Sequence, residues 1–172
     1  FLSVRAMSLP RPNALPWLLL SLAVIALDQL TKALIVAHFA VGQVQVLIPH
    51  LLDLTLAYNR GAAFNFLASA DGWQRWLFTL LAVGISAALV VALARTSRGA
   101  WRSALPYALI IGGALGNLID RLRLGHVVDF ILVHWKHDWY YPAFNVADSS
   151  ITVGAVLLVW FALFGTSRAA GR

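Results

Sequence analysis

Long apolar runs separated by shorter polar segments dominate the chain. Four of them approach the roughly 20 residues that a helix needs to cross a bilayer, namely residues 16–39, 76–94, 103–119 and 149–167. Residues 41–67 differ, because short, partly alternating, β-branched stretches broken at Pro49 and Gly61 favour strands at the membrane surface. We expect a mostly α-helical membrane protein with four transmembrane helices, a small extracytoplasmic β-rich segment and an interfacial loop.

The composition agrees with this class. Of the 172 residues, 60% are apolar and only 12% are charged, against roughly a quarter in ordinary globular proteins. This balance excludes a soluble domain and a disordered chain. The absence of cysteine excludes disulfides, thiolate metal sites and a cysteine nucleophile. The basic residues are dispersed, so nucleic acid is not an expected partner.

The placement of charge predicts the orientation. We expect one integral membrane domain over residues 1–172, whose outer surface segments are residues 41–72 and 122–145, with residues 1–6, before Met7, as a possible remnant outside the fold. All seven acidic residues are Asp and lie at one side of the predicted membrane or at its boundary. Basic residues flank the other side, namely Arg5, Arg11, Arg95, Arg98, Arg102, Arg168 and Arg172. Since positive flanks stay in the cytoplasm, both termini are predicted to be cytoplasmic.

Several polar side chains fall at or inside the predicted spans. Asp28 and Lys32 are spaced i, i+4, which predicts an intramembrane ion pair and argues against a cleaved signal peptide in the first span. Asn117, Asp120 and Arg121 share one helical face at the end of the third span. For Asp120 and Arg121, a helix-end ion pair and a substrate-positioning role are equally consistent with the pattern. Gly112 and Gly116 form a small-xxx-small pair suited to helix packing.

Two further carboxylates, Asp129 in GHVVDF and Asp148 in FNVADS, could converge at the same membrane depth. Two adjacent carboxylates cannot both ionise easily, so one keeps a proton while the other can act as a base on water, as in aspartic proteases. The structural alternatives are a loop carboxylate at Asp129 and a helix N-cap at Asp148.

Other chemistries stay open at this point. A Ser/Lys dyad would pair Lys32 with Ser149 or Ser150. A metal site would use His126, His134, His137 and Asp129. Without catalysis, the chain would be a small four-span transporter or channel subunit whose intramembrane Asp and Arg line an ion path, or a structural membrane subunit.

Four ordered motifs carry a resemblance that covers most of the chain. They are DQLTK at 28–32, LAYNRGAAFNF at 56–66, GGALGNLIDRLRLGHVVDF at 112–130 and PAFNVADSSITVG at 142–154. On these motifs the sequence resembles the lipoprotein signal peptidase (signal peptidase II) family of bacterial inner membranes.

The resemblance implies an aspartyl endopeptidase that cleaves the signal peptide of prolipoproteins immediately before a diacylglyceryl-modified cysteine. The family's catalytic aspartates match Asp129 and Asp148. The positions that surround the dyad or hold substrate match Asp28, Asn59, Asn117, Asp120, Arg121 and Asn145. It also implies inhibition by globomycin-like peptides, with the active site near the outer face of the membrane. We expect a monomer that contacts membrane lipid and uses no metal or cofactor, with residues 41–67 and 131–144 covering the substrate.

Overall fold

The described part of the chain is built on four long helices. The computed structural model describes residues 12–61, 72–136 and 138–165. A short 3-10 turn, η1 (Leu15–Trp17), leads into the first of the helices, which are α1 (Leu18–His38), α2 (Trp73–Arg95), α3 (Trp101–Leu124) and α4 (Val146–Phe164). Each is long and apolar enough to cross a membrane. The predicted class, a mostly helical four-span membrane protein, is confirmed.

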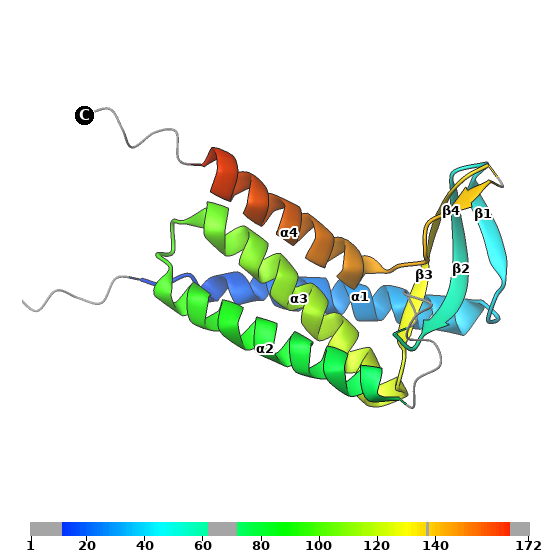
Figure 1. Ribbon diagram of the computed structural model, residues 1–172, viewed down its shortest axis with the longest axis horizontal. Coiled ribbons are helices and arrows are strands. Elements are labelled where there is room, and N and C mark those ends of the chain that lie inside the picture. The colour runs from blue at the N-terminus through cyan, green and yellow to red at the C-terminus, as the bar shows by residue number, and fades with distance from the viewer. Residues whose placement is uncertain (1–11, 62–71, 137, 166–172) are drawn as a thin grey trace, which may run out of the picture.

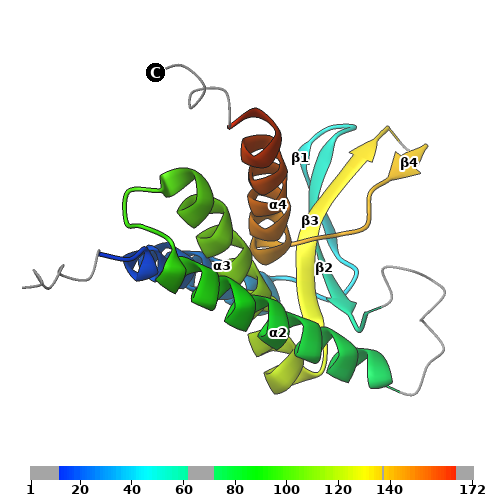
Figure 2. The ribbon, with the colours of Figure 1, turned by 60° about the vertical axis from the view of Figure 1, so that its left-hand side comes forward.

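Helix α3 is the centre of the bundle. Figures 1 and 2 show it between α1, α2 and α4. Within its most apolar stretch 61% of residues are buried inside the protein, whereas the corresponding share is 17–22% for the other three helices. The outer helices therefore leave most of their apolar surface free for lipid, while α3 carries the polar groups that need protein partners.

Glycines allow the helices to approach α3 closely. A Cβ atom on Gly112 would lie 2.8 Å from Cβ of Val24 in α1, and one on Gly116 would lie 2.8 Å from Oδ2 of Asp28. On another face of α3, a Cβ on Gly113 would collide with the carbonyl oxygen of Ala147 in α4. The packing contact predicted for Gly112 and Gly116 is therefore present, and it brings Asp28 against α3.

A four-stranded antiparallel sheet lies at one end of the bundle (Figure 1). Its strand order is that of the chain, β1 (Val44–Ile48), β2 (Leu52–Asn59), β3 (Val127–Trp135) and β4 (Trp139–Tyr140). The strands predicted after the first span are present as β1 and β2, while residues 62–71 lie outside the described residues. Part of the outer segment expected at residues 122–145 is strand and not loop, because β3 pairs with β2 and contains Asp129.

Among the helix ends that differ from the expected spans, two decide where the aspartates lie. Helix α3 does not stop at residue 119 but continues to Leu124, where Gly125 ends it with a φ of +78°. Helix α4 begins at Val146 with Asn145 as its N-cap, so Asp148 is the third helical residue and not the cap. Residues 166–167 of the expected fourth span are outside the described part of the chain. Asp120 and Asp148 therefore both project from within regular helix.

Candidate active site

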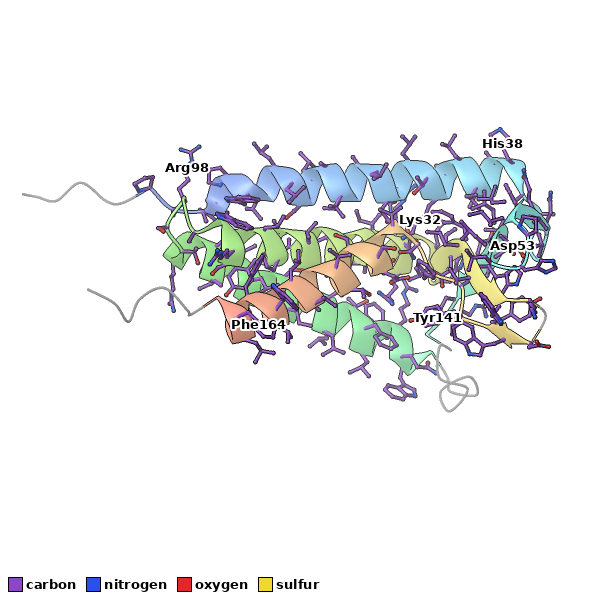
Figure 3. The ribbon with its side chains drawn as sticks, turned by 90° about the horizontal axis from the view of Figure 1, so that it is seen from above. Lys32, His38, Asp53, Arg98, Tyr141 and Phe164 are labelled. Atoms are coloured by element: carbon purple, nitrogen blue, oxygen red, sulfur yellow. The ribbon has the colours of Figure 1, made fainter. Side chains whose placement is uncertain are left out.

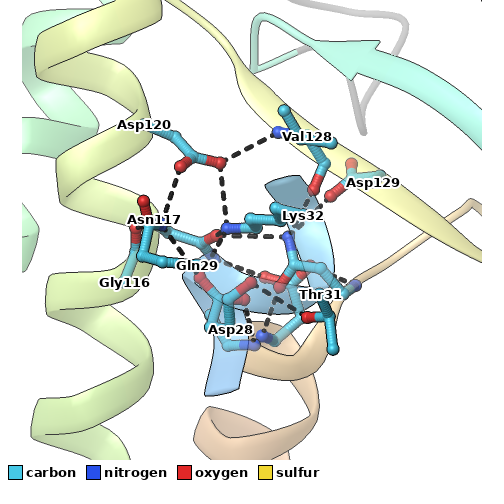
Figure 4. A network of polar contacts seen from close by, with 12 residues as sticks. Asp28, Gln29, Thr31, Lys32, Gly116, Asn117, Asp120, Val128 and Asp129 are labelled. Carbon is cyan, nitrogen blue, oxygen red and sulfur yellow. Dashed lines mark hydrogen bonds and ion pairs between the residues drawn. The ribbon is translucent and has the colours of Figure 1, made fainter. Parts of the chain in front are cut away.

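Lys32 is a buried cation at the centre of the polar region (Figure 4). Its Nζ lies 2.8 Å from Oδ2 of Asp28 and 2.9 Å from Oδ2 of Asp120, and donates to Oδ1 of Asn117 at 3.0 Å. The side chains of the three charged residues are at most 4% exposed. The predicted Asp28–Lys32 pair is present, and Asp120 extends it. Because such charges are costly to bury, each needs several partners.

Backbone and amide donors balance the two carboxylates. Asp28 Oδ1 accepts the backbone N–H of Ala147 at 2.9 Å, and Asp120 Oδ2 accepts that of Val128 at 3.0 Å. Asp120 Oδ1 accepts from Nε2 of Gln29 at 2.9 Å. The network thus ties α1 and α3 to the start of α4 and to β3. Sequence reasoning missed Gln29, although its place three residues before Lys32 puts it on the same side of α1.

Asn145 joins the two candidate catalytic aspartates. It is fully buried, and its Nδ2 donates to Oδ1 of Asp129 at 2.7 Å. Its Oδ1 accepts the backbone N–H of Asp148 at 2.9 Å, while Oδ2 of Asp148 accepts the backbone N–H of Asn145 at 3.3 Å, which completes a capping box. Asn117 Nδ2 donates to Oδ1 of Asp148 at 2.7 Å. The structure therefore brings Asp129 and Asp148 together, as the sequence predicted.

Burial raises the pKa of Asp129 to about 7, and the nearby charge of Asp148 adds to the increase. Hydrogen bonds from Asn59 and Asn145 and the charge of Lys32 act in the opposite direction. Asn59 ends β2, and its Oδ1 accepts the backbone N–H of Gly61 at 2.8 Å, which leaves its amide N–H groups to donate. Asp129, only 2% exposed, can therefore keep a proton near neutral pH.

Arg121 lies close enough to the dyad to act on it electrostatically, but it is not paired with Asp120. The guanidinium stacks over the ring of Phe78, 5.1 Å from its centroid, and it lies within the field of Asp129, Asp148 and Asp120. Among the described residues it makes no ion pair, because Asp120 is taken by Lys32. The helix-end ion pair considered from the sequence is thus absent there, which leaves a cation beside the dyad.

A cavity of about 300 Å³ reaches Asp148 from the side of α4. Its lining is aromatic and aliphatic apart from the hydroxyls and this carboxylate: Tyr141, Phe144, Asp148, Ser149, Thr152 and Val153. Tyr141 lies at the sheet end of the bundle (Figure 3). An apolar ligand that entered here would meet Asp148 at the half-buried edge of the polar network.

The contacts do not favour the competing chemistries. Ser149 Oγ donates to the carbonyl of Asn145 and Ser150 Oγ to that of Leu109, both at 2.9 Å, so neither hydroxyl is joined to Lys32. His126 stacks on Tyr58 with ring centroids 4.2 Å apart.

His134 is engaged elsewhere in the sheet, where its Nε2 lies 3.1 Å from Oδ2 of Asp53. His137 lies outside the described residues. Within the described ranges, no group of three or more His, Asp or Glu side chains is arranged to hold a metal ion. The described residues therefore do not form the metal site that was considered from the sequence.

Comparison with solved structures shows that this fold is similar to that of bacterial membrane enzymes. A bacterial membrane enzyme determined by the in meso method at 2.3 Å resolution superposes with a TM-score of 0.79 at 31% identity, over 95% of this chain and 98% of that one. The family model described as signal peptidase (SPase) II matches residues 20–164. The chain belongs to the signal peptidase II family.

Curated relatives agree with the family model. A lipoprotein signal peptidase of Pseudomonas aeruginosa (strain UCBPP-PA14) is 60% identical over 148 residues, which cover 86% of this chain and 88% of the relative. One of Pseudomonas putida (strain KT2440) is 56% identical over 155 residues, covering 87% and 91%. Together with the four apolar helices, this membership supports a protease of the bacterial inner membrane and does not favour a transporter or channel subunit.

Proposed function

We propose that this chain is an aspartyl endopeptidase that cleaves the signal peptide of prolipoproteins immediately before the diacylglyceryl-modified cysteine. The family and the curated lipoprotein signal peptidases support the substrate class. The observation that carries the mechanism is the shared contact with Asn145, whose side chain donates to Asp129 and pairs reciprocally with Asp148. Asn145 thus contacts both carboxylates before substrate arrives, Asp129 through its side-chain amide and Asp148 through its backbone N–H.

The proposed reaction divides the two carboxylates between acid and base. Asp148 borders the cavity and, when ionised, takes a proton from a water whose oxygen attacks the scissile carbonyl carbon. Asp129, whose pKa burial raises to about 7, gives its proton to the carbonyl oxygen. When the tetrahedral intermediate collapses, the C–N bond breaks and the proton held by Asp148 passes to the leaving amine. In the same step one hydroxyl of the intermediate becomes the product's carbonyl group and returns its proton to Asp129, which restores the dyad.

The contacts support two different roles for the other family-matched positions. Asn145 and Asn117 donate directly to the dyad, and Asp28 and Asp120 hold Lys32 behind them, so we assign these four a positioning role. Arg121 is free of ion pairs with the described residues, and we assign it to the unwound substrate backbone. That backbone has carbonyl groups that would be costly to leave unpaired in hydrocarbon.

Asn59 donates to Asp129 from β2, and its position at the strand end suits a contact with both the dyad and substrate. The sheet end of the bundle is proposed to cover the substrate. The segments concerned are the strands within 41–61 and the segment 131–144, apart from the undescribed residue 137. A cyclic peptide inhibitor of the globomycin type would occupy the same place. We further propose that the chain acts as a monomer and contacts membrane lipid directly.

The two ends of the bundle support the proposed orientation in the membrane. The sheet, which contains Asp129 in β3, lies at one end, while Arg98 and Phe164 lie at the other (Figure 3). Arg95 and Arg102 flank the same connection as Arg98, between α2 and α3. By the positive-inside rule this end is cytoplasmic, and so are the termini. The active site is then near the outer face, where water can reach the dyad while acyl chains stay in lipid.

The test is cleavage of a diacylglyceryl-modified prolipoprotein by the purified chain in detergent. We expect Asp129→Asn and Asp148→Asn each to abolish cleavage while circular dichroism shows unchanged helix content. Asp138→Asn is the matched control, because Asp138 is exposed at the same end of the bundle. Full activity in either dyad variant would refute the mechanism. Loss of activity in the Asp138 variant would show that the assay responds to charge alone.

A further inference from the structure

Another cavity, of about 390 Å³, opens between α1 and α3 at the sheet end of the bundle. It is lined by Gln29, Lys32, Ala33, Val36, Ala37, Asp120, Arg123, Leu124 and Val128. None of these residues lines the cavity beside Asp148. This α1/α3 groove therefore approaches the buried ion network from a different side than the proposed substrate site does.

The rim of the α1/α3 groove is apolar and open to the surroundings of the protein. Ala33, Val36 and Ala37 are exposed and follow one another at helical spacing along α1, so they form a stripe on one face. Leu124, which is 49% exposed, lies across from them at the end of α3. On a helix that spans the membrane, such a stripe faces hydrocarbon, and its small alanines leave room for an acyl chain.

The charges of the groove favour an anionic headgroup. Lys32 and Asp120 face each other in the wall, and both oxygens of Asp120 are taken by Lys32, Gln29 and a backbone N–H. Arg123 is different: it is exposed, and it makes no ion pair or hydrogen bond through its side chain to any described residue. It is thus the one lining cation without a counter-charge in the described part of the chain.

The position of Arg123 favours a lipid over a free inorganic anion as the occupant. It lies in the last turn of α3, next to Leu124 in the chain, and lines the same cavity as Ala33, Val36 and Ala37 of α1. A cation at the helix end suits the phosphate of a phospholipid headgroup, and the apolar groove beside it suits an acyl chain. A free inorganic anion would use the charge and leave the apolar rim unfilled.

We propose that the α1/α3 groove binds one anionic phospholipid, with its phosphate on Arg123 and one acyl chain along Ala33, Val36 and Ala37. The bound lipid would lie against the opposite side of the ion network that positions Asn117 and the dyad. The inference does not depend on the proposed peptidase mechanism, because it concerns lipid retention and not cleavage.

The test is native mass spectrometry of the full chain in detergent with dioleoyl phosphatidylglycerol or dioleoyl phosphatidylcholine. The parent should retain one phosphatidylglycerol in preference to phosphatidylcholine, and Arg123→Gln should reduce that preference about five-fold, the effect of one basic residue at a membrane surface. Arg102→Gln is the matched control, since Arg102 is an exposed arginine at the other end of the same helix. It should leave the preference unchanged.

A second pair of variants tests the groove itself. Ala37→Leu should fill the rim and lower retention of either lipid, whereas Ala26→Leu, at an exposed position of α1 outside the lining, should not. Circular dichroism confirms that each variant is folded. Equal retention of the two lipids by the parent, or an undiminished preference in Arg123→Gln, would overturn the proposal. An equal loss in Arg102→Gln would show general charge attraction and would overturn it as well.

Discussion

Replacing Asp129 by asparagine should stabilise the protein while it removes activity. Burial and the neighbouring Asp148 raise the pKa of Asp129 from 3.8 to about 7 in the folded chain. Between these values the folded state binds a proton that the unfolded state has released, so stability falls as the pH rises through this window. At 1.36 kcal/mol per pKa unit, the ionised carboxylate costs about 4 kcal/mol of folding stability above pH 7.

Asparagine avoids this cost because it is neutral at every pH, and its Oδ1 can still accept from Asn145. The cost that it removes is larger at pH 8 than at pH 5 by about 2 to 3 kcal/mol. For a chain of this length that difference corresponds to roughly 5 to 10 °C in the midpoint of thermal unfolding.

The assay is thermal unfolding in detergent at pH 5 and pH 8, followed by tryptophan fluorescence. Asp138→Asn serves as the control, because an exposed carboxylate should show no such pH-dependent gain. A stabilisation of Asp129→Asn that is the same at both pH values, or absent at pH 8, would refute the reasoning that burial imposes a cost on the ionised carboxylate.

Three more predictions concern the structure around the dyad. Lys32→Met should cost about 3 to 5 kcal/mol of unfolding free energy, since it leaves two buried carboxylates without their cation. Lys136→Met, at an exposed position, should be near neutral, and equal unfolding midpoints for the two variants would contradict this prediction. Asn145→Ala should abolish cleavage and lower stability by about 1 to 2 kcal/mol as a lost N-cap, and retained cleavage would disprove its positioning role. Gly113→Ala should destabilise by about 1 to 3 kcal/mol through contact with α4, whereas Gly84→Ala, with open space around it, should not; equal unfolding midpoints would show that α3 and α4 can separate freely.

The helices could be predicted from the sequence because a bilayer imposes one dominant rule, about 20 apolar residues per span. The ends of the helices could not, since they depend on tertiary partners. Helix α3 continues past Asp120 because that carboxylate finds Lys32 and the N–H of Val128 inside the protein and does not need to reach water. Strand β3 could not be predicted for a related reason. It is stabilised by pairing with β2, which is distant from it in the sequence.

The candidate site was more predictable in its members than in its connections. The i, i+4 spacing sufficed for Asp28 and Lys32, because both lie on one helix. The inclusion of Asp120 in the same ion network required the α1/α3 contact, which follows from the close approach at Gly116. No local pattern indicates that Asp120 chooses Lys32 over its neighbour Arg121. As a result, Arg121 lies beside the dyad without an ion-pair partner among the described residues.

Asp148 shows why a structural and a catalytic interpretation of one residue need not exclude each other. Its Oδ2 accepts the backbone N–H of Asn145 and so helps to begin α4, while its Oδ1 accepts from Asn117 and faces the network that leads to Lys32. The side chain of Asn145 in turn caps the helix with its oxygen and holds Asp129 with its nitrogen. The start of α4 and the geometry of the dyad are therefore set by the same hydrogen bonds. Any change that moves the helix start must also move the two carboxylates relative to each other.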